Sequence, residues 1–159
     1  MRLFCDAMLA GLARWLRAAG HDTLIAEPAA ADADLIATCL MEQRVLVSRD
    51  RRLIERAQAA IPAVLLTGKS LDEDARQLAA ALGLDWTDAP FTRCLTDNSV
   101  LRPANETERM NVPERSRNLP GPFTACPSCG RVFWPGGHVQ RMLVRLEGWK
   151  TPPHASLRR

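Results

Sequence analysis

Two aspartates stand just after short apolar segments, where carboxylates are well placed for metal chemistry. Asp6 follows the apolar residues 3–5, and Asp50 ends the segment RVLVSRD. Carboxylates that gather at one place repel each other, and a hard divalent cation such as Mg²⁺ or Mn²⁺ relieves this repulsion through oxygen ligands. Such an ion polarises a phosphodiester and activates a water molecule. Asp6 and Asp50 are therefore candidate ligands of Mg²⁺ or Mn²⁺, provided that the fold brings them together.

The segments before both aspartates are typical of strands in a parallel sheet. Residues 45–48 are apolar on both faces, as expected for a strand that is covered on both sides. Strand patterns alternate with helical patterns throughout residues 1–84. This alternation predicts right-handed βαβ crossovers and a central parallel sheet with helices on both faces. In such folds ligands bind beyond the carboxyl ends of the strands, so Asp6 and Asp50 meet there if their strands are neighbours.

A third carboxylate is expected from the start of the helix predicted within residues 29–43. Asp32 and Asp34 both lie near its first turn. An aspartate there can equally be a helix cap, or an acid that offsets the helix dipole, and spacing does not choose between these roles and metal binding. Asp50 has a similar alternative, because it directly precedes the helix predicted from residue 51 and can cap it.

The composition is that of a folded chain with a modest charge. The 159 residues are 47% hydrophobic and carry a formal net charge of +3, which suits one domain with a small attachment. No apolar run is long enough to span a bilayer, and Asp6 and Arg14 interrupt the region that a signal peptide would need to be apolar. Five cysteines, an odd number, favour a reducing compartment. We therefore expect a soluble cytoplasmic protein with no membrane partner, and no protein partner is indicated.

Basic residues are expected around the sheet edge that carries Asp6 and Asp50, and they favour a polyanionic partner. They are Arg14, Arg17, Arg49, Arg51, Arg52 and Lys69. Guanidinium groups bind phosphates through paired, charge-assisted hydrogen bonds. A single arginine more often lies on a solvated helix face, so it is the clustering that favours a phosphate backbone.

The pattern changes near residue 85. Prolines, asparagines and arginines replace the helical periodicity until the segment CPSCG at 126–130, and residues 138–149 are predicted to form a last helix. We expect three parts: residues 1–84, a smaller module at 85–150 and a flexible tail at 151–159. Cys5 and Cys39 are expected to be ordinary buried thiols.

Taken in order, these motifs resemble a known ribonuclease family. The segments FCDAMLAGLARWLRAAGHDT, DADLI and RVLVSRDRRL, followed by RCLTDN and CPSCGRVFWPGGH, resemble the family named after the C-terminal domain of the Mut-seven exonuclease, a branch of the PIN-like nucleases. The resemblance implies a PIN-like three-layer α/β/α fold and metal-dependent cleavage of RNA. It implies Asp6, Asp32 and Asp50 as metal ligands and catalytic residues.

The resemblance also bears on the alternatives left by the spacing. It favours Asp32 over Asp34, because Asp32 stands three residues before the pair at 35–36, while Asp34 remains a further catalytic candidate. It places Arg14 and Arg17 near the RNA. Two further candidates for RNA binding, at the arginine-rich edge, are Arg49 and Arg51.

The same resemblance implies a zinc ribbon after the nuclease domain. Two CxxC pairs make a tetrahedral zinc site. Here Cys126 and Cys129 form one intact pair, whereas the other reads Cys94 and Asp97, with aspartate in place of a cysteine. Aspartate can bind zinc through oxygen, so we expect one structural Zn²⁺ on these four residues. Two alternatives are that His138 supplies a ligand, or that zinc is lost and aromatic packing holds the ribbon.

We therefore predict a metal-dependent ribonuclease that hydrolyses RNA phosphodiester bonds. A second interpretation is an RNA- or ribosome-binding module with a weak or silent nuclease site, in which the arginine-rich ribbon carries the function. A third is a small-molecule phosphohydrolase with Asp6 as the nucleophile. The third ranks last, because the lid and phosphate-binding signals of such enzymes are not evident.

Overall fold

Four parallel strands form the main sheet. The computed structural model describes residues 1–150, so the expected tail at 151–159 lies outside the described residues. The strands are β1 (Arg2–Cys5), β2 (Asp22–Ile25), β3 (Val45–Ser48) and β4 (Ala63–Leu65). Their order is β2-β1-β3-β4, and every pairing is parallel. The predicted parallel sheet is confirmed, and the strand order reverses between β1 and β3.

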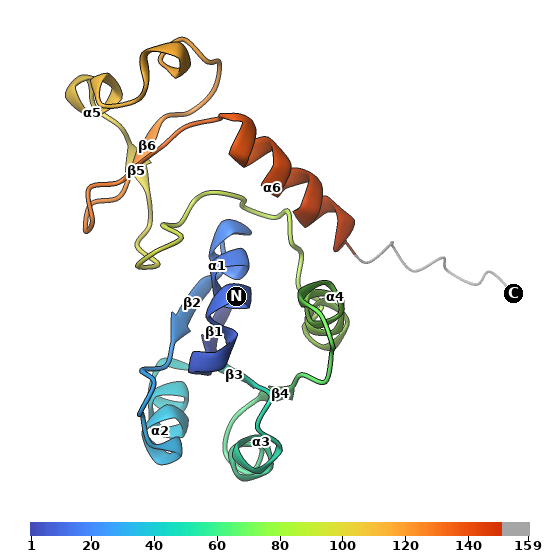
Figure 1. The fold of residues 1–159 in the computed structure, drawn as a ribbon. Helices are drawn as coiled ribbons and strands as arrows, with labels where there is room; N and C mark the ends of the chain where they lie inside the picture. Colours follow the sequence, from blue (N-terminus) through green and yellow to red (C-terminus); the bar gives the residue numbers. More distant parts are fainter. Residues whose placement is uncertain (151–159) are drawn as a thin grey trace, which may run out of the picture.

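Helices cover both faces of this sheet (Figure 1). On one face the core includes residues of α1 (Ala10–Ala18) and α4 (Leu71–Leu82), and on the other it includes residues of α2 (Asp32–Glu42) and α3 (Arg51–Ala57). Within β3, Val47 belongs to the first core and its neighbour Leu46 to the second. This is why the segment is apolar on both faces, and it gives the α/β class that the alternation predicts.

Capping residues and glycines mark the ends of these helices. Ser70 accepts a hydrogen bond from the N–H of Glu73 and starts α4, which ends at Gly83 in a left-handed conformation. Gly20 follows α1 with φ of 93°, and a Cβ atom there would lie 2.1 Å from the carbonyl oxygen of Ala89. Glycine at this position therefore allows the segment after α4 to approach α1 closely.

The second half of the chain contains a small antiparallel sheet. Its strands are β5 (Arg102–Pro103), β6 (Thr124–Ala125) and β7 (Val132–Phe133), in that order. Two short helices, α5 (Glu106–Met110) and η2 (Glu114–Ser116), lie between β5 and β6. In Figure 1 this ribbon stands beyond one end of the main sheet and is joined to it by an extended segment.

The last helix, α6 (Gly137–Gly148), returns to the main sheet and completes its first core (Figure 1). Leu146 is fully buried, and Trp149, just after the helix, is 2% exposed. The Trp149 ring makes edge contacts with Trp15 and Trp86 at centroid distances of 5.0 and 4.9 Å. Such aromatic pairs are stabilising beyond the area they bury. The helix is therefore part of the core built by the first half of the chain.

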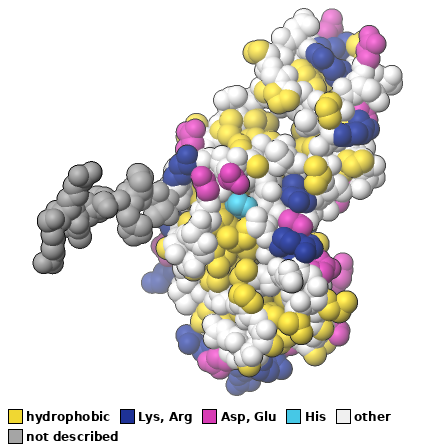
Figure 2. All heavy atoms as spheres, turned by 180° about the vertical axis from the view of Figure 1, so that it is seen from behind, with side chains coloured by type: hydrophobic (Ala, Val, Ile, Leu, Met, Phe, Trp, Pro, Cys, Tyr) yellow, Lys and Arg dark blue, Asp and Glu magenta, His cyan; other side chains and the backbone are white. Residues whose placement is uncertain are grey.

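The described surface carries mixed charges. Figure 2 shows basic and acidic side chains interspersed over the larger lobe, which contains the main sheet, and over the smaller lobe formed by the ribbon. The face in that view shows no single extended basic surface. A site for an anion on that face must therefore come from a local group of cations.

No helix within residues 1–150 is long and apolar enough to cross a membrane.

Candidate metal centres and their basic surroundings

Asp6 and Asp50 lie at the same edge of the main sheet. The N–H of Asp6 donates to the carbonyl of Val47 at 3.0 Å, which extends the β1–β3 pairing beyond the strand end. The hydroxyl of Ser48 donates to Oδ2 of Asp6 at 2.7 Å and accepts the N–H of Asp50 at 2.9 Å. Because Ser48 is fully buried, it fixes the Asp6 carboxylate and ties it to the loop that carries Asp50. The expectation that these aspartates follow neighbouring strands is confirmed.

Asp50 also caps α3. Its Oδ1 accepts the N–H groups of Arg52 and Leu53 at 2.8 and 3.1 Å, so the capping role that the sequence left open is present. Both bonds use the same oxygen, and capping therefore leaves Oδ2 available to a further ligand. Asp50 is exposed and Asp6 is half-buried, so solvent reaches this edge.

Asp32 and Asp34 lie in the first turn of α2, but neither caps it. The N-cap is Ala31, which has no side-chain acceptor. Asp32 forms an ion pair with Arg56 of α3, and Asp34 is exposed. Within residues 1–150, three or more metal-ligating side chains come within 4.8 Å of one another at one place only, which is in the ribbon. The edge thus holds two aspartates linked by a serine, while Asp32 is engaged in an ion pair.

An ion pair between a buried aspartate and an exposed arginine borders the same edge, and no pattern in the sequence indicated it. Asp74 is 2% exposed and pairs with Arg49, whose guanidinium also donates to the carbonyl of Gly68 at 2.7 Å. Burial raises the pKa of Asp74, which the positive charge of Arg49 opposes. In the sequence Asp74 is one of three acids in the first turn of α4, so it resembles a residue that offsets the helix dipole. Ser48 was missed because it ends an apolar strand.

The predicted RNA-binding arginines differ in their surroundings. Arg17 is 5% exposed, and its guanidinium donates to the carbonyls of Thr23 at 2.9 Å and Thr96 at 2.7 Å. Burial lowers the pKa of Arg17. The bond to Thr96 attaches α1 to the extended segment that leads into the ribbon, and the bond to Thr23 attaches it to β2. Arg14 and Arg51 are exposed, so their guanidinium groups are accessible to a phosphate.

Three cysteines and one aspartate converge in the ribbon. Ligand atoms of Cys94, Asp97, Cys126 and Cys129 all lie within 4.8 Å of one another. The sulfurs of Cys94 and Cys129 are 3.7 Å apart, and the Cys126 sulfur is 3.2 Å from Oδ2 of Asp97. Three sulfur donors and one carboxylate oxygen suit a tetrahedral zinc ion. The four residues expected to form the zinc site are thus brought together.

Two turns of the same backbone geometry present these four side chains. In each turn the N–H of the fifth residue donates to the carbonyl of the first, Asn98 to Cys94 at 3.0 Å and Gly130 to Cys126 at 3.1 Å. The fifth residue has φ of 71° in both turns. Asp97 is the fourth residue of its turn, as a cysteine is in the other. Its carboxylate therefore occupies the position of a fourth cysteine.

Backbone donors favour the ionised forms of two of these ligands. The N–H of Ser99 donates to Asp97 at 2.9 Å and holds the pKa of that carboxyl well below its usual range. Burial raises the pKa of the Cys126 thiol, but nearby N–H groups, including that of Cys129, more than offset this and lower it. Zinc binds deprotonated ligands. His138 is exposed on α6 and is not among the converging side chains.

One protein family matches most of the chain. The family model described as the Mut7-C RNAse domain matches residues 1–146, which include the main sheet, the ribbon and most of α6. The chain therefore belongs to the Mut7-C RNAse domain family. No curated protein and no solved structure is significantly similar to it. The family description names ribonuclease activity, which indicates RNA as the substrate class.

Proposed function

We propose that this chain is a PIN-like, metal-dependent ribonuclease that hydrolyses RNA at the carboxyl edge of the main sheet. The observation that carries the proposal is the pair Asp6 and Asp50, joined through buried Ser48 at the ends of two neighbouring parallel strands. The strand order reverses between these strands, which is where ligands bind in open α/β sheets. Membership of a family described as an RNAse domain supports the same reaction.

In this proposal Asp6 and Asp50 are the primary ligands of Mg²⁺ or Mn²⁺. Magnesium is commonly held by one or two carboxylates together with waters and substrate phosphates, so two fixed carboxylates are sufficient to hold it beside RNA. When bound, the ion supplies polarisation of the phosphodiester and activation of a water for in-line attack. Asp32 joins as a third ligand by exchanging its ion pair with Arg56, and Asp34 on the same turn is a further candidate.

The chain's own residues contribute by holding charges in place. Ser48 orients the Asp6 carboxylate, and the two N–H donors at the start of α3 orient Asp50. Neither carboxylate then has to reorganise during the reaction, which is the advantage of a preorganised site. Arg51 follows Asp50 directly, and Arg49 is 37% exposed on its side chain. Both are proposed to bind phosphates that flank the cleaved bond.

We propose that the ribbon holds one structural Zn²⁺. The two matching turns and their four converging side chains support this. Arg17 of α1 binds the carbonyl of Thr96, which lies inside the first turn. Zinc would therefore stabilise the attachment of the ribbon to the nuclease half as well as the ribbon itself.

Cleavage assays on RNA with Mn²⁺, Mg²⁺ or EDTA test the proposal. The variant to compare with wild type is Asp50→Asn, because asparagine caps helices as well as aspartate does and only the charge is lost. Metal-dependent cleavage should fall by on the order of a hundredfold or more. The control is Asp88→Asn, an exposed aspartate outside the edge, which should cleave like wild type. Equal cleavage by wild type and Asp50→Asn would rule out the proposed mechanism.

One observation favours a second function, an RNA- or ribosome-binding module with a silent nuclease site. Asp32 is paired with Arg56, so the edge presents two carboxylates rather than three. The variant Arg56→Gln separates the two functions, since it releases Asp32 without touching the edge. A nuclease should cleave at least as fast with this change. A binding module should leave RNA intact through long incubation with Mn²⁺, with or without the substitution.

A further inference from the structure

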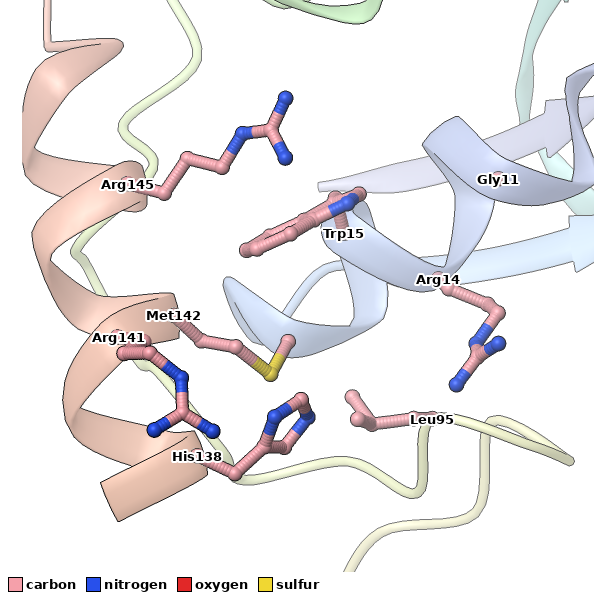
Figure 3. A pocket seen from close by; sticks show the side chains of 8 residues that line it. All are labelled: Gly11, Arg14, Trp15, Leu95, His138, Arg141, Met142 and Arg145. Atoms are coloured by element: carbon pink, nitrogen blue, oxygen red, sulfur yellow. The ribbon is translucent and has the colours of Figure 1, made fainter.

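A pocket of about 520 Å³ lies between α1 and α6, and none of the candidate metal ligands at the sheet edge or in the ribbon cluster lines it (Figure 3). Arginine and histidine side chains form its polar wall, and no acidic residue lines it. The charged side chains are Arg14 on α1 and Arg141 and Arg145 on α6, and the imidazole of His138 lies beside them. A pocket whose charged lining residues are all positive attracts an anion, because a low-dielectric wall strengthens their common field.

Two of the arginines are free to bind a ligand. Arg145 donates to Asp72 at 3.0 Å, whereas Arg14 and Arg141 form no ion pair with another residue in the described part of the chain. Figure 3 shows their guanidinium groups on opposite sides of the pocket, with the ring of His138 between them. The two groups are therefore placed to bind two successive phosphates, one on each side of the pocket.

The rest of the wall is mainly apolar. It is formed by Trp15, Leu95 and Met142. Trp15 is held by its edge contact with Trp149 and by the guanidinium of Arg145, which lies 5.2 Å from its ring centroid. A base gains stacking energy on an aromatic ring of this kind, and an immobile ring loses little entropy in the process.

We propose that this pocket binds one nucleotide of a single-stranded RNA, with the phosphates on its two sides on Arg14 and Arg141 and its base beside Trp15. The volume is that of a pocket for one small ligand, which excludes a duplex. Met8, Gly11 and Arg14 form an exposed face of the first helical segment, and this face leads from the pocket towards Asp6. The assignment of RNA as the ligand rests on the proposed ribonuclease function.

The test is the binding of a short, fluorescently labelled single-stranded RNA in EDTA, so that no cleavage occurs. Each of Arg14→Gln and Arg141→Gln should weaken binding by about fivefold to tenfold, and each should reduce the slope of log affinity against log salt by about 0.7. The matched control is Arg2→Gln. This removes the same charge at the opposite, amino edge of the sheet, and binding should stay within about twofold of wild type.

Stacking is tested at Trp15. The variant Trp15→Phe keeps an aromatic face and should retain most of the affinity, whereas Trp15→Leu should lose about tenfold. Thermal unfolding of both variants is measured first, and binding is compared well below the lower midpoint. Equal losses in the two variants would show that the ring only supports the core and would overturn its role in stacking.

The outcomes separate this inference from the nuclease proposal. If both arginine variants bind RNA like wild type while Asp50→Asn abolishes cleavage, the pocket is not an RNA site and the nuclease stands. If the arginine variants lose binding but no protein cleaves, the pocket stands and the nuclease proposal fails. A mononucleotide is titrated in parallel. Tighter binding of the mononucleotide than of the RNA would overturn the assignment to a strand.

Discussion

Replacing Asp22 by asparagine should weaken the junction between the main sheet and the ribbon. Oδ1 of Asp22 accepts hydrogen bonds from Arg44 and from the side chain of Asn98, both at 2.8 Å. Asn98 in turn accepts the N–H of Thr23 at 2.9 Å. Arg44 is 5% exposed, so the loss of its charged partner is felt in a mostly buried place. One carboxylate thus connects β2, the residue before β3 and the first ribbon turn.

The size of the effect follows from the pKa of Asp22. Burial alone raises this pKa, but the bonds from Arg44 and Asn98 outweigh burial and lower it to about 2, against an ordinary value of 3.8. At about 1.36 kcal/mol per pKa unit, the difference corresponds to about 2.4 kcal/mol of stability at neutral pH. The side chain is 20% exposed, and solvent screening reduces this to about 1–2 kcal/mol.

The sign of the pH dependence is set by the lowered pKa. A group whose pKa is lower in the folded than in the unfolded state stabilises fully above the unfolded value and ceases to stabilise as the pH falls through the folded value. Urea unfolding of wild type and Asp22→Asn, followed by tryptophan fluorescence, should differ by about 1–2 kcal/mol at pH 7 and by roughly half as much at pH 3. The control Asp88→Asn should match wild type at both. A difference that is absent, or equal at the two pH values, refutes the reasoning.

Three further predictions concern the ribbon and the backbone. Chelation of zinc should lower the melting temperature and expose the three ribbon thiols to a thiol reagent, while Cys5 and Cys39 stay unreactive, because burial raises their pKa values to about 12 and about 11. Reaction of all five thiols at once in the folded protein would contradict this. The substitution Asp97→Cys should tighten zinc binding by at least about tenfold in competition with a chromogenic chelator, since thiolate is the better zinc ligand; equal affinity would argue that Asp97 is not a ligand. Gly83→Ala should cost about 1–2 kcal/mol in denaturant unfolding through its left-handed backbone alone, because no atom lies within 4 Å of the added Cβ. Gly20→Ala should cost clearly more, since its Cβ would meet a backbone carbonyl, and equal costs would show that this close approach relaxes freely.

Features that depend on local pattern could be predicted from the sequence. Residues 45–47 are apolar because alternate side chains enter two different cores, and that requirement is visible in the residues themselves. The placement of Asp6 and Asp50 at the ends of two strands could be predicted for the same reason, because it is a property of a few neighbouring residues. The four ribbon side chains were found from the CPSCG and CLTDN segments and the family that they resemble.

Features that depend on which helices are neighbours in space could not be predicted. Asp32 meets Arg56 because α2 and α3 lie on the same face of the sheet. Arg17 is buried because the segment after α4 passes over α1. The pairing of Asp74 with Arg49 likewise joins residues from different elements. None of these contacts imposes a regular spacing of residues along the chain, so the contacts cannot be predicted from a pattern in one sequence.

The position of Trp149 has a consequence for the order of events during synthesis. Helix α6 leaves the ribosome after the other described elements, yet it closes the core beside Trp15 and supplies one side of the basic pocket. The sheet edge with Asp6 and Asp50 can form before that, because it needs only residues from the first half of the chain. A nascent chain would therefore form the sheet edge with Asp6 and Asp50 before it completes the pocket that is proposed to bind single-stranded RNA. A chain truncated after residue 136 lacks α6, so it is expected to bind single-stranded RNA no better than the double variant Arg14→Gln, Arg141→Gln.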